Sequence, residues 1–103
     1  MSFLRKLFGL GPKADYAEMM KRGAIIVDVR TPDEYRNGHI TGSLNIPLHS
    51  LSNNFSKLKK DECIICCCAS GMRSGSATGI LRSKGFTEVY NGGSWMGLQN
   101  KIT

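Results

Sequence analysis

The chain has 103 residues, which is enough for one domain with one modest hydrophobic core. Its net charge of +6 suits small anions or an acidic protein partner. The sequence has no basic helix interleaved with aromatic residues, so it does not indicate binding to nucleic acid. Three of the four cysteines are consecutive and form no disulfide framework, which indicates a reducing compartment, the cytoplasm.

Residues 1–12 are expected to be an N-terminal tail or short amphipathic segment, and residues 13–103 a single folded domain. The tail has an apolar stripe made of Phe3, Leu4, Leu7 and Phe8. This stripe is too short to span a membrane, and the segment lacks the apolar core and cleavage site of a signal peptide. We therefore expect the tail to pack on the domain or to fray rather than to contact a membrane.

A short helix and a buried strand open the domain. Asp15 has the position of an N-cap residue, and Glu18 follows it by three residues as in a capping box. This pattern predicts a helix to about Arg22, with Gly23 as its stop. The β-branched apolar run at residues 24–29 then predicts a strand that is buried in a sheet.

A second helix start follows this strand. Thr31 is placed as an N-cap, Pro32 as the first helical residue and Glu34 as the third. Gly38 is expected to end the helix, and residues 43–46 predict another strand. After Pro47, the apolar spacing over residues 48–55 indicates a loosely helical stretch that breaks at Asn53-Asn54.

The second half of the chain repeats the alternation. Residues 62–67 predict a buried strand, residues 73–84 a helix that stops at Gly85, and residues 88–90 a short strand. Residues 91–94 are predicted to form a turn. Strands that alternate with helices imply an α/β fold with a mainly parallel sheet, predicted to be five-stranded, and helices on both faces.

The stretch from Cys63 to Ser74 carries the chemistry. A continuous apolar run gives way to small residues and glycine, and a helical pattern begins after Arg73. A buried strand, a tight loop and a helix start make a cradle for an anion, because backbone N–H groups without partners converge there with the positive end of the helix dipole. Cys68 ends the strand, so these donors are expected to stabilise its thiolate and to lower its pKa.

The other cysteines are expected to pack in the core. Cys63, Cys66 and Cys67 lie within the apolar run, and free cysteine is among the most buried residue types. Cys63 and Cys66 form a C-x-x-C pair, but it lies within a strand and has no second pair. We therefore expect no metal site.

Three stretches together resemble the single-domain rhodanese family of thiosulfate and persulfide sulfurtransferases. They are Cys68-Ala69-Ser70-Gly71-Met72-Arg73-Ser74, the segment from Asp28 to Pro47, and Gly85-Phe86-Thr87-Glu88-Val89-Tyr90-Asn91-Gly92-Gly93. The resemblance implies a rhodanese-like three-layer sandwich and sulfurtransferase activity without a cofactor. Cys68 would be the catalytic residue and would carry a persulfide.

The resemblance also implies how the substrate is bound. The substrate-binding residues would be those of the loop after the cysteine, namely Ala69, Ser70, Gly71, Met72 and Arg73. Their N–H groups would hold the anionic outer sulfur, and Arg73 would attract the donor, although its side chain could equally point outward. The expected partners are a small anionic sulfur donor and a thiol, cyanide or sulfur-carrier protein as acceptor, and the chain is expected to be a monomer.

Two other functions compete with this interpretation. Phosphatases and arsenate reductases of the same fold use a Cys-x5-Arg loop, whereas Cys68 and Arg73 are separated by four residues here. A non-catalytic binding module would be marked by loss of the loop cysteine, which is present. Two other residues stay outside the catalytic proposal, because His39 is expected to be structural and Trp95 suits either a core anchor or the site mouth. The residues after Trp95 fall short of the longer terminal helix that many relatives have.

Overall fold

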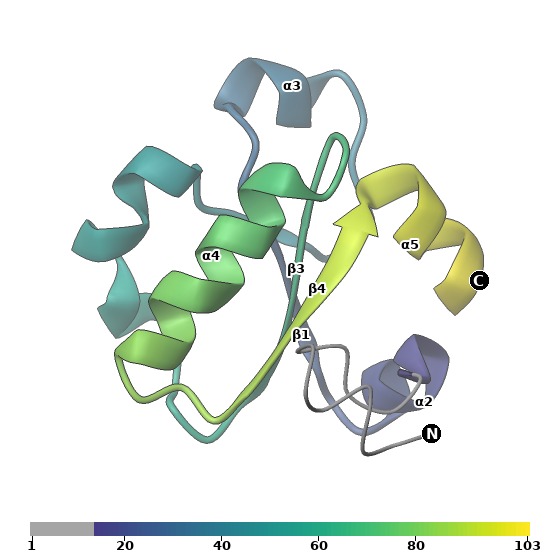
Figure 1. Cartoon of the computed structure of the whole chain (residues 1–103). Helices are drawn as coiled ribbons and strands as arrows, with labels where there is room; N and C mark the ends of the chain where they lie inside the picture. The colour runs from purple at the N-terminus through teal and green to yellow at the C-terminus, as the bar shows by residue number, and fades with distance from the viewer. Residues whose placement is uncertain (1–13) are drawn as a thin grey trace.

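The computed structural model describes residues 14–103, so the predicted N-terminal tail lies outside the described residues. These residues form one parallel sheet with the strand order β2-β1-β3-β4 (Figure 1). The strands are β1 (Ile25–Asp28), β2 (Leu44–Asn45), β3 (Cys63–Cys68) and β4 (Glu88–Ser94). The parallel sheet is as predicted, but it has four strands rather than five. The four segments predicted as strands correspond to β1, β2, β3 and β4, and residues 14–103 contain no fifth strand.

Helical segments cover both faces of the sheet, so the predicted three-layer sandwich is confirmed (Figure 1). One face carries α4 (Met72–Ser83) and the 3-10 segments η1 (Leu48–Asn53) and η2 (Phe55–Lys57). The other face carries α2 (Tyr16–Lys21) and α5 (Trp95–Ile102), and α3 (Pro32–Arg36) lies beyond one end of the strands. None of these helices has the length and apolar character needed to cross a membrane.

The helix starts form where the capping residues predicted them. The Asp15 carboxylate accepts a hydrogen bond from the N–H of Glu18 and begins α2. Thr31 and Glu34 form a reciprocal capping box at the start of α3: the Thr31 hydroxyl accepts from the N–H of Glu34, and the Glu34 carboxylate accepts from the N–H of Thr31. These local signals fix the direction in which each helix leaves the sheet.

Alternation along the inner strands divides the core into two layers. In β3, Ile64 and Cys66 point toward α4 and the 3-10 segments, whereas Ile65 and Cys67 point toward α2 and α5. All four side chains are fully buried, because a parallel inner strand is covered on both faces. Cys66 and Cys67 therefore fill the core, as predicted.

The end of the chain differs from the prediction. Residues 91–94 continue β4 instead of forming a turn, and a bulge absorbs the glycines: Cys66 pairs with Asn91, but Cys68 pairs with Ser94. The Ser94 hydroxyl accepts a hydrogen bond from the N–H of Gly97 and begins α5, whose Leu98 is buried. The chain thus ends in an eight-residue helix that covers the sheet.

Candidate active site

Cys68 is the last residue of β3 and its side chain lies directly under the loop that leads into α4. The Sγ atom accepts hydrogen bonds from the N–H of Gly71 at 3.0 Å and from the N–H of Ser74 at 3.4 Å. Gly71 stands at the N-cap of α4 with φ +102°, a conformation that favours glycine. This turn aims the Gly71 N–H back at the sulfur. Cys68 has no exposed surface in this arrangement.

The environment of Cys68 lowers the pKa of its thiol. Burial by itself raises this pKa, but hydrogen bonds from the Ser74 side chain and from the N–H groups of Ser74, Ser70 and Gly71 outweigh it. In contrast, burial raises the pKa of Cys66 and of Cys67 to about 12. Burial also raises the pKa of Cys63. Cys68 is therefore the one cysteine of the four that favours the thiolate.

The predicted binding loop is open to solvent except where it meets the sulfur. Ala69 and Ser70 are exposed, and Met72 is 81% exposed. Gly71 turns its N–H toward Sγ as the cradle requires. Met72 and Arg73 open α4, and the first N–H groups of a helix have no partner within that helix. These groups are thus placed at the rim of the cysteine site.

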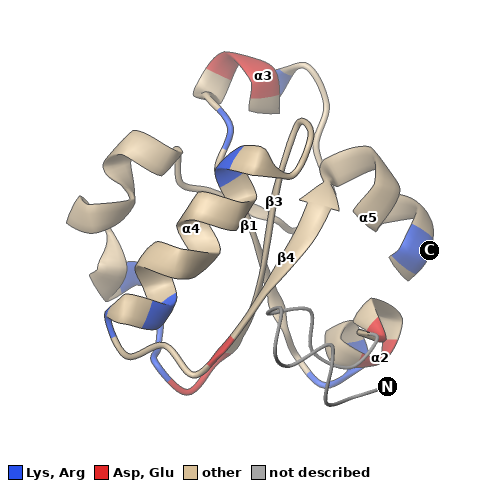
Figure 2. Ribbon diagram, viewed as in Figure 1, with Lys and Arg blue, Asp and Glu red and all other residues tan. Residues whose placement is uncertain are grey.

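The Arg73 side chain reaches α3. Its guanidinium donates two hydrogen bonds to the Glu34 carboxylate, at 2.7 and 2.9 Å. In Figure 2, α3 and its acidic residues lie above the start of α4, and the Arg73–Glu34 ion pair connects the two helices. The Arg73 hydrogen bonds lower the pKa of Glu34 to about 2, and the same contacts raise the pKa of Arg73. The side chain predicted to attract the donor therefore connects the cysteine loop to a neighbouring helix.

A buried ion pair braces the end of β1 beside this site. Asp28 is fully buried, and Arg30 donates to its two carboxylate oxygens at 2.7 to 3.1 Å. Arg30 also donates to the Gly38 carbonyl oxygen at 2.7 Å and lies over the Trp95 ring, 4.9 Å from its centroid. The half-buried Trp95 packs against the core layer of α2 and α5. Arg30 and Trp95 thus hold the connection after α3 against the start of α5.

The histidines take no part in the cysteine site. His39 stacks on the Tyr35 ring with centroids 3.7 Å apart, and its Nδ1 lies 2.7 Å from the Tyr35 carbonyl oxygen. This is the structural role predicted for it, and His49 is exposed on η1. Residues 14–103 contain no cluster of three or more side chains suited to bind a metal ion.

Two residues near Cys68 have roles that the sequence pattern does not predict. Ser74 is fully buried and contributes both its N–H and its hydroxyl to the surroundings of the sulfur. The sequence offers one signal for this role: Ser74 lies six residues after Cys68, in the first turn of the predicted helix. Asn91 contacts the same loop from β4, where the sequence predicts only a turn.

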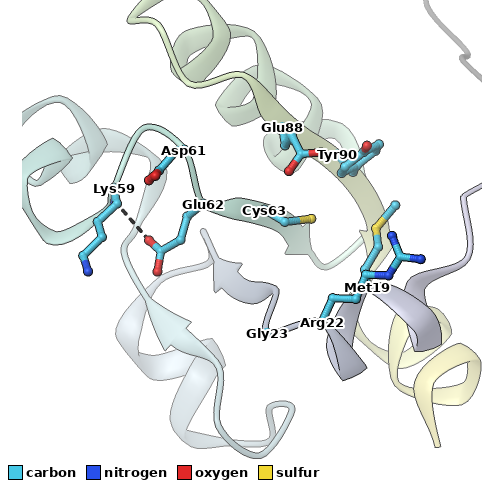
Figure 3. Close-up of a pocket in the computed structure, with 9 residues that line it drawn as sticks. All are labelled: Met19, Arg22, Gly23, Lys59, Asp61, Glu62, Cys63, Glu88 and Tyr90. Atoms are coloured by element: carbon cyan, nitrogen blue, oxygen red, sulfur yellow. Dashed lines mark hydrogen bonds between the residues drawn. The ribbon is translucent and has the colours of Figure 1, made fainter.

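A separate pocket lies at the opposite end of β3. It has a volume of about 480 Å³ and lies among the end of α2, the segment before β3 and the start of β4 (Figure 3). Cys63, the first residue of β3, lines it together with acidic and basic side chains, among them Glu88 and Arg22. Because the pKa of Cys63 is raised, this pocket offers no activated nucleophile.

The fold and the site define a class of α/β protein in which a cysteine with a lowered pKa ends an inner parallel strand and faces a helix N-terminus. Residues 13–101 match the family model described as the rhodanese-like domain. The chain therefore belongs to the rhodanese-like domain family, which confirms the resemblance seen in the sequence.

Curated relatives have similar sequences over most of this chain. The thiosulfate sulfurtransferase GlpE of Stutzerimonas stutzeri is 41% identical over 73 residues, which cover 71% of this chain and 67% of that protein. The uncharacterized protein YqhL of Bacillus subtilis is also 41% identical, over 70 residues that cover 68% of this chain and 56% of that protein. The matched region thus spans little more than half of the Bacillus protein.

Solved structures have the same fold. A rhodanese with anions from E. coli is 31% identical, with a TM-score of 0.69, over 73% of this chain and 91% of that chain. The reduced CoADR-RHD protein of Bacillus anthracis is 29% identical, with a TM-score of 0.73, over 96% of this chain but only 18% of that chain. The same domain therefore occurs both as most of a small protein and as a minor part of a large one.

Proposed function

We propose that this protein is a sulfurtransferase that moves sulfane sulfur from thiosulfate or a persulfide donor to an acceptor through a persulfide on Cys68. The observation that carries the proposal is the contrast among the cysteines. Only Cys68 has its sulfur within reach of loop N–H groups and a lowered pKa. A cysteine is the nucleophile in its thiolate form, so this residue suits covalent catalysis.

In the first step, the Cys68 thiolate attacks the outer sulfur of thiosulfate. A bond forms between Sγ and that outer sulfur, the sulfur–sulfur bond of thiosulfate breaks, and sulfite leaves with the electron pair. Cys68 then carries a persulfide whose outer sulfur is anionic. The N–H groups that open α4, together with the positive end of its dipole, are placed to stabilise this negative charge.

In the second step, an acceptor nucleophile takes the outer sulfur. The acceptor can be cyanide, a small thiol or the thiol of a carrier protein, each reacting as its anion. A bond forms between the acceptor and the outer sulfur, the persulfide bond breaks, and the Cys68 thiolate is regenerated with the electron pair. The cycle needs no cofactor and no proton donor, because every leaving group departs as a stabilised anion.

Arg73 and Glu34 support this chemistry indirectly in the proposal. Their ion pair fixes the first turn of α4, so the N–H groups of that turn keep their direction toward Cys68. The positive charge of Arg73 favours an anionic donor nearby but is largely balanced by Glu34. The proposal therefore assigns binding of the donor mainly to the backbone of residues 69–73.

Intact mass after incubation with thiosulfate tests the proposal. One sulfur atom should add about 32 Da, and cyanide should remove it with release of thiocyanate. Cys68→Ser should lose the adduct, whereas Cys63→Ser, which changes a cysteine at the other end of β3, is the matched control and should keep it. An undiminished adduct on Cys68→Ser would exclude Cys68 as the sulfur carrier.

A further inference from the structure

Asn91 connects the cysteine loop to β4 through a single side-chain amide. Its Nδ2 donates to the Gly71 carbonyl oxygen at 3.1 Å, and its Oδ1 accepts from the N–H of Gly93 at 3.0 Å. A backbone acceptor on one side and a backbone donor on the other allow only one orientation of the amide. The oxygen therefore faces Ser74, whose hydroxyl lies 2.6 Å from Oδ1.

The backbone around this amide is closely packed. A Cβ atom on Gly71 would lie 3.3 Å from the Gly93 Cα, so the loop and the bulge of β4 touch through two glycines. A Cβ atom on Gly75 would lie 3.3 Å from the Asn91 Nδ2, so α4 also leaves room for the amide. The Tyr16 hydroxyl holds the Asn91 carbonyl oxygen at 3.0 Å. Asn91 is thus fixed from four sides.

Ser74 cannot serve Asn91 and Cys68 as a donor at the same time. A serine hydroxyl has one hydrogen to donate. The Ser74 oxygen lies 2.6 Å from the Asn91 Oδ1 and 3.4 Å from the Cys68 Sγ. When the hydrogen points to Asn91, the Ser74 oxygen can only accept from a Cys68 thiol, which stabilises the protonated form. When it points to Sγ, it stabilises the thiolate.

We propose that Asn91 is a positioning residue of the Cys68 site, which holds the hydroxyl hydrogen of Ser74 and so limits how strongly that hydroxyl stabilises the thiolate. The proposal deepens the proposed function, because it concerns the reactivity of the sulfur that would carry the persulfide. Strong stabilisation of a thiolate lowers its nucleophilicity as well as its pKa. The competition between Asn91 and Cys68 therefore keeps the thiolate a stronger nucleophile than full donation by Ser74 would leave it.

The test is a double-mutant cycle on the pH midpoint of Cys68 alkylation by iodoacetamide. The four proteins are the unmodified chain, Ser74→Ala, Asn91→Ala and the double variant. With Asn91 present, the Ser74 hydroxyl divides its hydrogen between Oδ1 and Sγ, so its removal should raise the midpoint only moderately. With Asn91 replaced, the Ser74 hydroxyl is free to donate to Sγ. Its removal should then raise the midpoint by at least about 0.4 pH unit more than Ser74→Ala does when Asn91 is present.

Other charges near Cys68 cancel in this comparison. The ionisable groups that interact with it are the thiols of Cys66 and Cys67 in β3 and the guanidinium of Arg73 in α4. All three are present in all four proteins. Asn45→Ala is the matched control, because the Asn45 amide also bridges backbone groups, donating to the carbonyl oxygens of Asp28 and Arg30, but touches neither Ser74 nor Cys68. It should leave the effect of Ser74→Ala unchanged.

Equal shifts for Ser74→Ala in the presence and absence of Asn91 would overturn the proposal and leave Asn91 a purely structural residue. If Asn91→Ala does not fold, Asn91→Asp replaces it, since a carboxylate is a stronger acceptor for the Ser74 hydrogen. In that background, Ser74→Ala should shift the midpoint less than in the unmodified chain, and an equal or larger shift would contradict the proposal. Alkylation needs no sulfur transfer, so the result is independent of whether thiosulfate loads Cys68.

Discussion

Glu34 in α3 and Arg73 in α4 form a two-pronged ion pair between segments 39 residues apart in the chain, with hydrogen bonds of 2.7 and 2.9 Å. The same Glu34 carboxylate caps its own helix through Thr31. One side chain therefore couples the start of α3 to the loop that surrounds Cys68. This contact holds the guanidinium of Arg73 against α3.

Replacing Glu34 with glutamine should destabilise the protein in a pH-dependent way. Over a third of each side chain is exposed, so water screens the pair and the loss at pH 6 should be a few tenths to about 1 kcal/mol. The folded pKa of Glu34, about 2, is below its ordinary value of 4.5. The stabilisation is therefore complete above about pH 4.5 and is lost as the pH falls toward 2.

Urea unfolding of both proteins at pH 6 and at pH 2.5 measures this difference. The gap between the unmodified chain and Glu34→Gln should narrow at the lower pH. Glu18→Gln is the control, because it removes an ion pair with Arg22 that lies within one exposed helix turn. A gap that widens as the pH falls would contradict the assigned role of Glu34.

Local signals in the sequence predict most of the fold, because they act over a few residues. Asp15 and Thr31 begin helices through hydrogen bonds to residues three positions away, and the apolar run before Cys68 requires a strand covered on both faces. The position of Cys68 at the strand end follows from the same pattern.

What the sequence pattern misses depends on contacts between distant segments. Two glycines after Asn91 are typical of a turn, but pairing with β3 absorbs them as a bulge and lets β4 run on to Ser94. The partner of Arg73 and the contacts of Asn91 arise only when α3, α4 and β4 meet. No local spacing encodes these contacts, so the composition of the site is predicted less completely than its position.

The cysteines should differ sharply in their reactivity with iodoacetamide. Cys68 should react with a midpoint below the ordinary thiol value of about 8.5, because hydrogen bonds lower its pKa. Cys66 and Cys67, with pKa values raised to about 12 and no exposed surface, should react only after unfolding. Peptide mass mapping after short exposure at several pH values gives the midpoint of each residue.

The midpoint is the decisive quantity in that experiment, since access through the loop changes the rate but not the pH at which the thiol ionises. Cys68 is buried, so its maximal rate should be modest. A Cys68 midpoint at or above about 8.5 would contradict the view that the loop stabilises its thiolate.

Asp28→Asn should destabilise the protein much more than loss of an exposed acidic residue. Asp28 is fully buried and balances the buried guanidinium of Arg30, so the neutral amide leaves that charge uncompensated. The expected loss is about 3 kcal/mol or more. Thermal and urea unfolding measure it against Asp33→Asn, which removes an exposed ion pair with Arg36 and should cost at most about 1 kcal/mol. Similar losses for the two variants would refute the bracing role of Asp28.

The length of the loop between Cys68 and Arg73 should determine which substrate the protein accepts. Four residues separate them, and the Gly71 N–H already reaches Sγ at 3.0 Å, so the space above the sulfur is small. A tetrahedral phosphate could not meet all the loop donors, and unmet donors and steric overlap both raise the barrier. The unmodified protein should therefore form thiocyanate from thiosulfate and cyanide and fail to hydrolyse an aryl phosphate.

Inserting one glycine after Gly71 should lower the sulfurtransferase activity at least about tenfold, because it moves the Gly71 turn off its contact with Gly93 and widens the donor ring. If phosphatase or arsenate reductase activity appears, we expect it in the variant with the wider loop and not in the unmodified chain. A glycine inserted after Gly42, in the exposed turn before β2, lengthens the chain outside the cysteine loop and serves as the control. Both activities are assayed on all three proteins. Efficient phosphate ester hydrolysis by the unmodified chain, without thiocyanate formation, would replace the sulfurtransferase proposal with the phosphatase alternative.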